Sequence, residues 1–326
     1  MRRRWCLLLA VPMAVLLDAC APDQTPGWCE GEGARILRER SLSGSRFRRV
    51  EEMLRGVAEG EVVLFAHRGG FHCEELDAAP ENSLANVEKA VRMGFDGFES
   101  DLWRTSDGEF VVHHDATLDR TTHEPGRVSL HTLEQIRTLS LMYPSGSVSQ
   151  EKVPTLQEFL RACRDRIIPL IEPKGLTREY LPEILQIARE AGVLDQVLVW
   201  VTWSEETVLR YEEHLQAGLA EVRTNVVWRV DSLEKLEDVV SRFDPPLIDL
   251  SPSMRRLELE KSFLHIAPRG HMSLIERVVP TSSTLMVSRI ITNSYLDAMY
   301  ERGVRVFMSR DPERQLLHLV EKGLHP

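Results

Sequence analysis

The chain has 326 residues, enough for one large domain with short extensions or for two smaller domains. Apolar residues make up 43% and charged residues 28%, which is typical of a globular protein and excludes a wholly disordered chain or one with many membrane spans. The net charge of −10 argues against general nucleic-acid binding, although it allows a local cationic site for an anionic small molecule.

The first 20 residues have the layout of an export signal. Three arginines at positions 2–4 precede an apolar run over residues 6–17. This run is too short to span a bilayer, because a transmembrane helix needs about 20 residues. Residues 17–20, Leu-Asp-Ala-Cys, are similar to a bacterial lipobox, whose cysteine is lipidated; a plain secretory signal is the alternative. We therefore expect an exported protein, either anchored to a membrane through lipid on Cys20 or periplasmic.

Residues 21–60 predict a tether followed by a helix. The segment is polar and rich in Arg and Glu, but apolar side chains recur at helical spacing near its end. These are Val50, Met53, Leu54 and Val57. We expect this helix to pack against the main domain, which spans residues 61–326.

The main domain alternates short β-branched runs with amphipathic stretches, which is the pattern of an α/β fold. The eight runs predicted as strands are 62–66, 97–102, 110–114, 167–172, 197–202, 225–230, 247–250 and 304–309. Eight such units over this length favour a TIM (β/α)8 barrel. An open doubly wound sheet would also alternate, but no glycine-rich phosphate loop follows the first strand. Residues 251–288 are less periodic and receive no assignment.

Several helix boundaries are marked in the sequence. Residues 83–93 predict a helix that ends at Gly94. Helix starts are predicted where a capping residue is followed three positions later by Glu. These pairs are Thr155 with Glu158 and Asp231 with Glu234.

Titratable side chains end four successive predicted strands. They are His67 and Arg68, Glu99 and Asp101, His114 and Asp115, and Glu172 and Lys174. The carboxyl ends of barrel strands meet at one rim, so we expect these groups to gather there. Glu99 and Asp101 are two residues apart on a strand and face the same side, and Glu172 could supply a third oxygen to a divalent cation. The alternative is that these carboxylates only pair with nearby cations.

The two histidines, His67 and His114, suit a general acid and a general base, because imidazole titrates near neutral pH. His113 alternates away from His114 on the same predicted strand, so we expect it to be structural. Arg68 and Lys174 supply fixed positive charge for a phosphoryl group. Ion pairing alone is the other interpretation of these two cations.

Three tryptophans lie near the ends of two later predicted strands. They are Trp200, Trp203 and Trp228. They could line a pocket for an alcohol group, or they could be core and rim packing.

Eight short motifs, in order over residues 62–174, resemble those of glycerophosphodiester phosphodiesterases. They are His67-Arg68-Gly69, Pro80-Glu81-Asn82-Ser83, Glu99-x-Asp101, Asp107-Gly108, His114-Asp115, Leu118-Asp119-Arg120-Thr121-Thr122, Pro154-Thr155-Leu156-x-Glu158 and Glu172-Pro173-Lys174. Any one of them is common, whereas eight in order are specific to the family.

The resemblance implies a TIM barrel that hydrolyses glycerophosphodiesters to glycerol 3-phosphate and an alcohol, with a divalent metal, Ca2+ or Mg2+, as cofactor. It assigns the metal to Glu99, Asp101 and Glu172, acid/base catalysis to His67 and His114, and substrate binding to Arg68, Glu81 and Lys174. The implied partner is a small phosphodiester and not nucleic acid. Two alternatives stay open: a sphingomyelinase-D-like phospholipase acting on lysophospholipids, and a lipoprotein that binds a phosphodiester without turnover.

Overall fold

The computed structural model describes residues 35–37, 47–70, 79–250, 284–290, 292–301 and 303–326. The expected export signal, Cys20 and most of the expected tether lie outside these residues. Within the described ranges, no helix combines the length and the apolar character needed to cross a bilayer.

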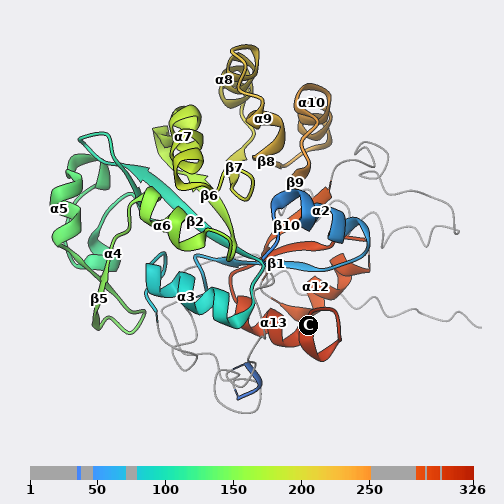
Figure 1. Cartoon of the computed structure of the whole chain (residues 1–326), viewed down its shortest axis with the longest axis horizontal. Coiled ribbons are helices and arrows are strands. Elements are labelled where there is room, and N and C mark those ends of the chain that lie inside the picture. The colour runs from blue at the N-terminus through green and yellow to red at the C-terminus, as the bar shows by residue number, and fades with distance from the viewer. Residues whose placement is uncertain (1–34, 38–46, 71–78, 251–283, 291, 302) are drawn as a thin grey trace, which may run out of the picture.

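Eight parallel strands close into a barrel, which confirms the predicted fold (Figure 1). In order around the barrel they are β1 (Val63–His67), β2 (Gly97–Arg104), β6 (Ile168–Pro173), β7 (Leu198–Thr202), β8 (Val226–Val230), β9 (Leu247–Leu250), β10 (Thr284–Ile290) and β11 (Val306–Ser309). The last strand pairs with the first, with Val306 opposite Val63, so the barrel has no open edge.

The crossover helices surround these strands (Figure 1). They are α3 (Leu84–Met93), α6 (Leu156–Cys163), α7 (Leu181–Ala191), which follows the short helix η4 (Gly175–Tyr180), α8 (Glu205–Gln216), α9 (Glu221–Thr224), α10 (Leu233–Phe243), α12 (Asn293–Tyr300) and α13 (Pro312–Glu321). Apolar side chains fill the layer between strands and helices. Trp228 belongs to this layer, where its ring stacks on Phe243 with centroids 4.7 Å apart, so it is a packing residue.

One strand prediction was wrong, and one barrel strand was not predicted. The run 110–114 was expected in the barrel, but β3 (Phe110–Val112) is a short strand antiparallel to β2. The reason is the turn at Asp107-Gly108, where Gly108 has φ 92° and the chain returns directly beside β2; a parallel neighbour needs a crossover of about a dozen residues. The missing barrel strand is β10, which begins within the segment that received no assignment.

The helix signals were mostly correct. Gly94 ends α3 in the left-handed conformation, with φ 84°, as predicted. Thr155 forms the expected capping box with Glu158 at the start of α6. The second box was wrong by one residue, because the side chain of Ser232, and not that of Asp231, accepts the backbone N–H at the start of α10.

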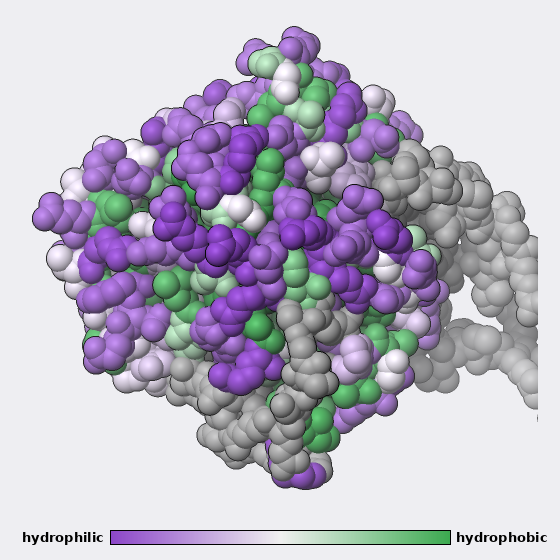
Figure 2. Space-filling view, viewed as in Figure 1, coloured by the Kyte–Doolittle hydropathy of each residue, from purple (hydrophilic) through white to green (hydrophobic). Residues whose placement is uncertain are grey.

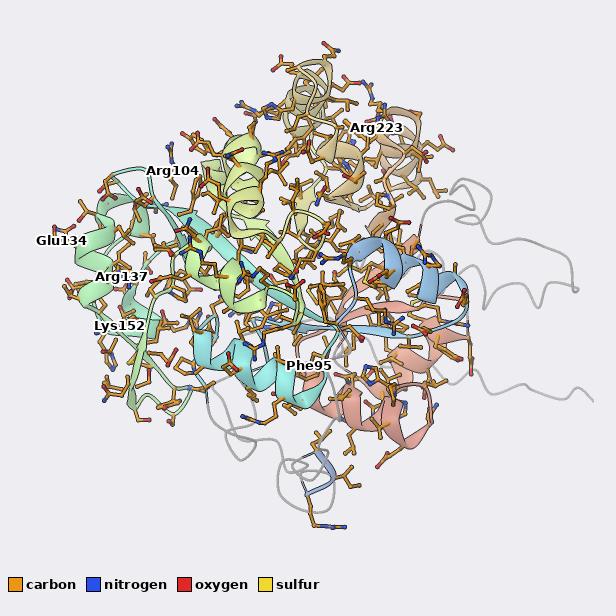
Figure 3. The ribbon with its side chains drawn as sticks, viewed as in Figure 1. Phe95, Arg104, Glu134, Arg137, Lys152 and Arg223 are labelled. Atoms are coloured by element: carbon orange, nitrogen blue, oxygen red, sulfur yellow. The ribbon has the colours of Figure 1, made fainter. Side chains whose placement is uncertain are left out.

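A side lobe, residues 113–154, separates β3 from β6. It contains α4 (Asp119–Thr122), η3 (Val128–Leu130), α5 (Leu133–Thr138), β4 (Ser140–Met142) and β5 (Val148–Lys152). With Val111 of β3 it encloses a small apolar core of its own, formed by Leu118, Val128, Ile136, Leu141 and Val153. Figures 1 and 3 show the side lobe on the left, with Glu134, Arg137 and Lys152 labelled on it, away from Arg223 of α9.

The end of the barrel at the amino termini of the strands is apolar. It is closed by α2 (Val50–Ala58), the helix expected before the barrel. Val50, Met53 and Val57 of α2 are buried in one cluster with inward-facing strand residues such as Phe65. Arg49 fixes the start of α2 through an ion pair of 2.6 Å with Asp195, just before β7. Because this end is closed, the opening of the barrel lies at the carboxyl ends of the strands, where barrel active sites are found.

The face of the molecule shown in Figure 2 is largely hydrophilic, with apolar residues in small groups.

Candidate active site

Three carboxylates converge toward the carboxyl ends of two neighbouring strands. Glu99 and Asp101 lie on β2, and the β-ladder pairs Asp101 with Glu172 on β6. Each of the three offers an oxygen within 4.8 Å of the others. Glu99 and Asp101 are fully buried, whereas Glu172 is partly exposed. The structure therefore brings together all three residues that the sequence predicts as metal ligands.

The acidic cluster carries unfavourable negative charge. Burial, together with the charges of Asp101 and Glu172, raises the pKa of Glu99 well above its usual range. One oxygen of Glu99 accepts the backbone N–H of Arg68 at 3.1 Å, and the other, Oε1, is buried and has no hydrogen-bond partner among the described residues. A buried carboxylate oxygen without a partner, beside two further hard oxygen donors, is what a site for a divalent cation provides. The three side chains can therefore hold such a cation.

Lys174 lies beside two of these acids. Its ammonium is 2.9 Å from Asp101 Oδ1 and 2.5 Å from Glu172 Oε2. Burial disfavours the charged form of Lys174, but Asp101 and Glu172 outweigh this effect and raise its pKa. Burial likewise opposes ionisation of Asp101, yet Lys174 and neighbouring cations lower the pKa of that carboxyl. Lys174 is thus a fixed positive charge at the cluster, as the sequence predicts.

The turn after β1 positions His67 and Arg68. Arg68 has φ 49°, an uncommon conformation for a residue with a side chain, and Gly69 follows with φ 83°. A Cβ on Gly69 would lie 2.2 Å from the Phe98 ring, so only glycine fits there. The Asn86 side chain donates to the Arg68 carbonyl at 2.8 Å and fixes the turn. This geometry puts His67 Nε2 at 3.9 Å from Glu99 Oε2.

His114 reaches the site from the start of the side lobe. Its Nδ1 is 2.5 Å from Asp115 Oδ1, and the Trp103 indole donates to the His114 carbonyl at 3.1 Å. Because Asp115 engages Nδ1, the other ring nitrogen, Nε2, is the one available to a substrate. His113 is structural, as predicted: its ring nitrogens lie 2.9 Å from the Asp115 carbonyl and 2.7 Å from Thr121 Oγ1.

Glu81 and Arg120 link Arg68 to the partner of His114. The Arg120 guanidinium donates to both oxygens of Glu81, at 2.8 and 2.6 Å, and to Asp115 at 2.7 Å. Arg68 is 3.3 Å from Glu81 on the other side. Burial opposes ionisation of Glu81, but the two arginines more than offset it and lower the pKa of that carboxyl. The structure thus places Glu81 in contact with Arg68, where it orients that guanidinium.

Two further residues of the motifs support the site. Arg120 joins Glu81 to the partner of His114, and Asn82 donates to Asp101 Oδ2 at 3.3 Å. Asn82 also has φ 58°, a conformation in which Asn is enriched. For Arg120, motif membership was the only signal, because its contacts join distant parts of the chain.

Known proteins share this arrangement of motifs and fold. The family model described as "Glycerophosphoryl diester phosphodiesterase family" matches residues 67–234, just over half of the chain. The chain belongs to this family. The family assignment confirms the resemblance seen in the motifs and identifies the protein as a phosphodiesterase.

Two relatives in other organisms are glycerophosphodiester phosphodiesterases by name. A glycerophosphodiester phosphodiesterase of Caldanaerobacter subterraneus subsp. tengcongensis is 26% identical over 270 residues, which are 81% of this chain and 99% of that protein. Glycerophosphodiester phosphodiesterase 1 of Bos taurus is 39% identical over 134 residues, so the match spans 39% of this chain and 38% of the bovine protein.

Solved structures share the fold at low identity. The glycerophosphodiester phosphodiesterase of Agrobacterium tumefaciens superimposes with a TM-score of 0.59 at 22% identity, over 78% of this chain and 99% of that one. A phosphodiesterase of Oleispira antarctica, solved in complex with the product sn-glycerol-3-phosphate, gives a TM-score of 0.58 at 18% identity, over 79% of this chain and 97% of that one.

Proposed function

We propose that the protein hydrolyses glycerophosphodiesters to glycerol 3-phosphate and an alcohol, with Ca2+ or Mg2+ held by Glu99, Asp101 and Glu172. The observation that carries the proposal is the convergence of these carboxylates, two imidazoles and two cations at one barrel mouth. The names of the relatives and the product bound to the Oleispira antarctica protein support the same substrate class.

The side chains supply complementary parts of this reaction. When bound, the divalent cation neutralises charge on the phosphoryl oxygens and so favours attack at phosphorus. Arg68 and Lys174 add fixed positive charge beside the same oxygens, and their ion pairs with buried acids hold them in place. A phosphodiester therefore meets a site whose charges are already oriented.

Proton transfer falls to the two histidines. One imidazole accepts a proton from the attacking oxygen, and the other donates a proton to the departing alcohol. Asp115 orients the His114 ring through Nδ1, which is the part that an acidic neighbour plays for a catalytic histidine. His67 lies at the acidic cluster itself, with Nε2 3.9 Å from Glu99 Oε2.

A product assay tests the proposal. The full chain is incubated with a panel of glycerophosphodiesters, with a chelator and after add-back of Ca2+ or Mg2+, and the products are identified by phosphorus NMR. We expect glycerol 3-phosphate, formed only when a divalent cation is present. Turnover of lysophospholipid to a cyclic phosphate would indicate the sphingomyelinase-D-like alternative, and tight binding without any product would indicate a non-catalytic protein.

We also propose, from the sequence of the first 20 residues, that the protein is exported and anchored to a membrane through Cys20. Mass spectrometry of the mature N-terminus after expression in a bacterial host tests this proposal. Diacylglyceryl on Cys20 is the expected result, with release of the protein from membranes in Cys20→Ser. An unmodified N-terminus at another residue would point to simple secretion.

A further inference from the structure

A second polar group faces the mouth from the opposite side of the barrel. It consists of Arg229 on β8, Asp249 on β9 and Ser288 on β10, none of which lies in a family-like motif. The residues two positions earlier on the same strands are Val227, Leu247 and Met286, all of which belong to the apolar cluster inside the barrel. Because side chains on a strand alternate, the three polar residues also face the interior, one layer closer to the mouth.

Strand order and register put Arg229 across from His67. In the ring of eight strands, β8 lies four strands from β1 in either direction. Following the ladder from Arg229 leads in turn to Asp249, Met286, Val306 and Val63. An eight-stranded barrel of this type is staggered by about eight residues per circuit, and so by about four over half a circuit. The residue level with Arg229 is therefore His67, four positions beyond Val63.

We call the two sides of the mouth the near wall and the far wall. The near wall is His67, Arg68, Glu99, Asp101, Glu172 and Lys174. The far wall is Arg229, Asp249 and Ser288.

The far wall holds one guanidinium in a fixed place. Arg229 Nε lies 3.7 Å from Asp249 Oδ2, and its Cζ is 5.0 Å from the centroid of the Trp200 ring. Asp249 is itself fixed, because it accepts the backbone N–H and the hydroxyl of Ser288 at 3.0 and 2.8 Å. An ion pair and an aromatic face thus orient Arg229 before any ligand arrives.

The N–H donors of Arg229 have no hydrogen-bond acceptor among the described residues. Its side chain is only 11% exposed, yet no hydrogen bond to it is found in the part of the chain that the structure describes. A guanidinium has five N–H donors in a fork that matches a carboxylate or phosphate, so a partly buried guanidinium without protein acceptors suits an anionic ligand. Asp249 already accepts two hydrogen bonds from Ser288 and pairs with Arg229, so the charge of this carboxylate is compensated within the wall.

We propose that Arg229 is a specificity-determining residue that binds a second anionic group, a carboxylate or phosphate on the alcohol part of the substrate. The inference rests on the proposed function, in which the scissile phosphodiester lies against the near wall. A substrate bound there extends across the mouth toward the guanidinium. The enzyme therefore prefers diesters with an acidic alcohol part over those with a neutral or cationic one.

Two substrates that differ by a single carboxylate test this proposal. Glycerophosphoserine and glycerophosphoethanolamine are compared by kcat/KM in the wild type, Arg229→Gln and Arg229→Lys. We expect the wild type to prefer the serine diester and Arg229→Gln to reduce that preference by about tenfold, since a charge-assisted bidentate pair is lost. Arg229→Lys keeps the charge without the fork, so it should retain part of the preference.

The control is Arg242→Gln on α10, which removes an exposed arginine paired with Glu212 and Asp238. It should leave the ratio of the two kcat/KM values unchanged. A folding defect in Arg229→Gln lowers both values together and does not move their ratio. An unchanged ratio in Arg229→Gln, or an equal loss on both diesters, would overturn the proposal and show a structural role or a contact with the shared glycerol.

Binding by calorimetry in the presence of a chelator separates this inference from the proposed function. If no diester is hydrolysed with any cation, the proposed function fails, and the binding ratio still tests Arg229. Tighter binding of the serine diester to the wild type, with the difference lost in Arg229→Gln, supports the inference independently. Equal binding of the two diesters to the wild type contradicts it.

Discussion

The two walls of the mouth differ in how densely they carry charge. On the near wall every cation lies against an acid, as Lys174 does between Asp101 and Glu172 and Arg68 does beside Glu81. Among the described residues, Arg229 of the far wall pairs with Asp249 alone, and its guanidinium donates no hydrogen bond to them. On the two proposals above, the many charged groups of the near wall perform the reaction, and the far wall, with fewer charged groups, selects the substrate.

The largest expected effect comes from removing the near-wall acids. Glu99→Gln with Asp101→Asn keeps the shape of the cluster but removes the charge that holds a divalent cation, so we expect turnover to fall by at least about 10³-fold. Glu134→Gln on α5 is the matched control, because this exposed carboxylate lies on the side lobe, far from the cluster (Figure 3). Steady-state assays with excess Ca2+ or Mg2+ measure the effect. Near-normal activity in the double variant would show that these acids are not needed for the reaction.

The next effect concerns the histidine from the side lobe. His114→Ala should lower kcat by about 10²- to 10⁴-fold, the usual contribution of a general acid or base. Asp115→Asn keeps the imidazole but loses the charge next to Nδ1, so we expect a smaller loss, about 10- to 100-fold. Rescue by Asp115→Glu is the discriminating measurement, since a carboxylate that reaches Nδ1 should recover part of the kcat lost in Asp115→Asn. An Asp115→Asn variant as active as the wild type would contradict this role.

We expect a loss of stability when the buried ion pair beside the turn after β1 is broken. Lys89 on α3 donates to the Gly70 carbonyl at 2.9 Å and to Glu313 of α13 at 2.8 Å, and both charged side chains are fully buried. Lys89→Met leaves Glu313 buried without its partner and should lower the free energy of unfolding by about 3 kcal/mol in denaturant titrations.

Combining Lys89→Met with Glu313→Gln is the control for this pair. It removes both charges and should recover part of the lost stability. Equal loss in the single and the double variant would show that the pair contributes nothing beyond packing.

The smallest effect is a pH dependence of stability at Glu81. Its pKa is lowered on folding, so it stabilises the fold above its ordinary value of 4.5, and this contribution is lost as the pH falls through the lowered pKa. Glu81→Gln should therefore cost about 2 kcal/mol of unfolding free energy at neutral pH. The difference from the wild type should shrink in acid, as followed by denaturant titrations from pH 3 to about 7. A difference that stays constant over this range would contradict the role of the charge.

The sequence predicted the near wall better than the far wall, for a physical reason. The near-wall residues fall within residues 67–174, in motifs whose spacing places them at strand ends. Arg229, Asp249 and Ser288 are single residues on three strands, and only the closure of the barrel brings them together. Ion pairing of Arg68 was weighed from the sequence, whereas the contact of Glu81 with Arg120 could be seen only in three dimensions.

The fold was predicted correctly even though one strand was misassigned. Phe110–Val112 has the β-branched character of a strand, and composition alone does not distinguish an antiparallel hairpin strand from a parallel barrel strand. The Asp107-Gly108 turn was the available signal for the hairpin. β10 lacked a clear boundary in the sequence and was not predicted. Since β3 was counted in its place, the predicted number of barrel strands was still eight.

Direct titration of Ca2+ or Mg2+ into the chelator-treated protein tests the central claim most sharply. Calorimetry should show one site per chain in the wild type and in Glu134→Gln, and no site in the variant that combines Glu99→Gln with Asp101→Asn. Stoichiometric binding that survives in that variant, or no binding of either cation by the wild type, would contradict the assignment of the acidic cluster as the metal centre.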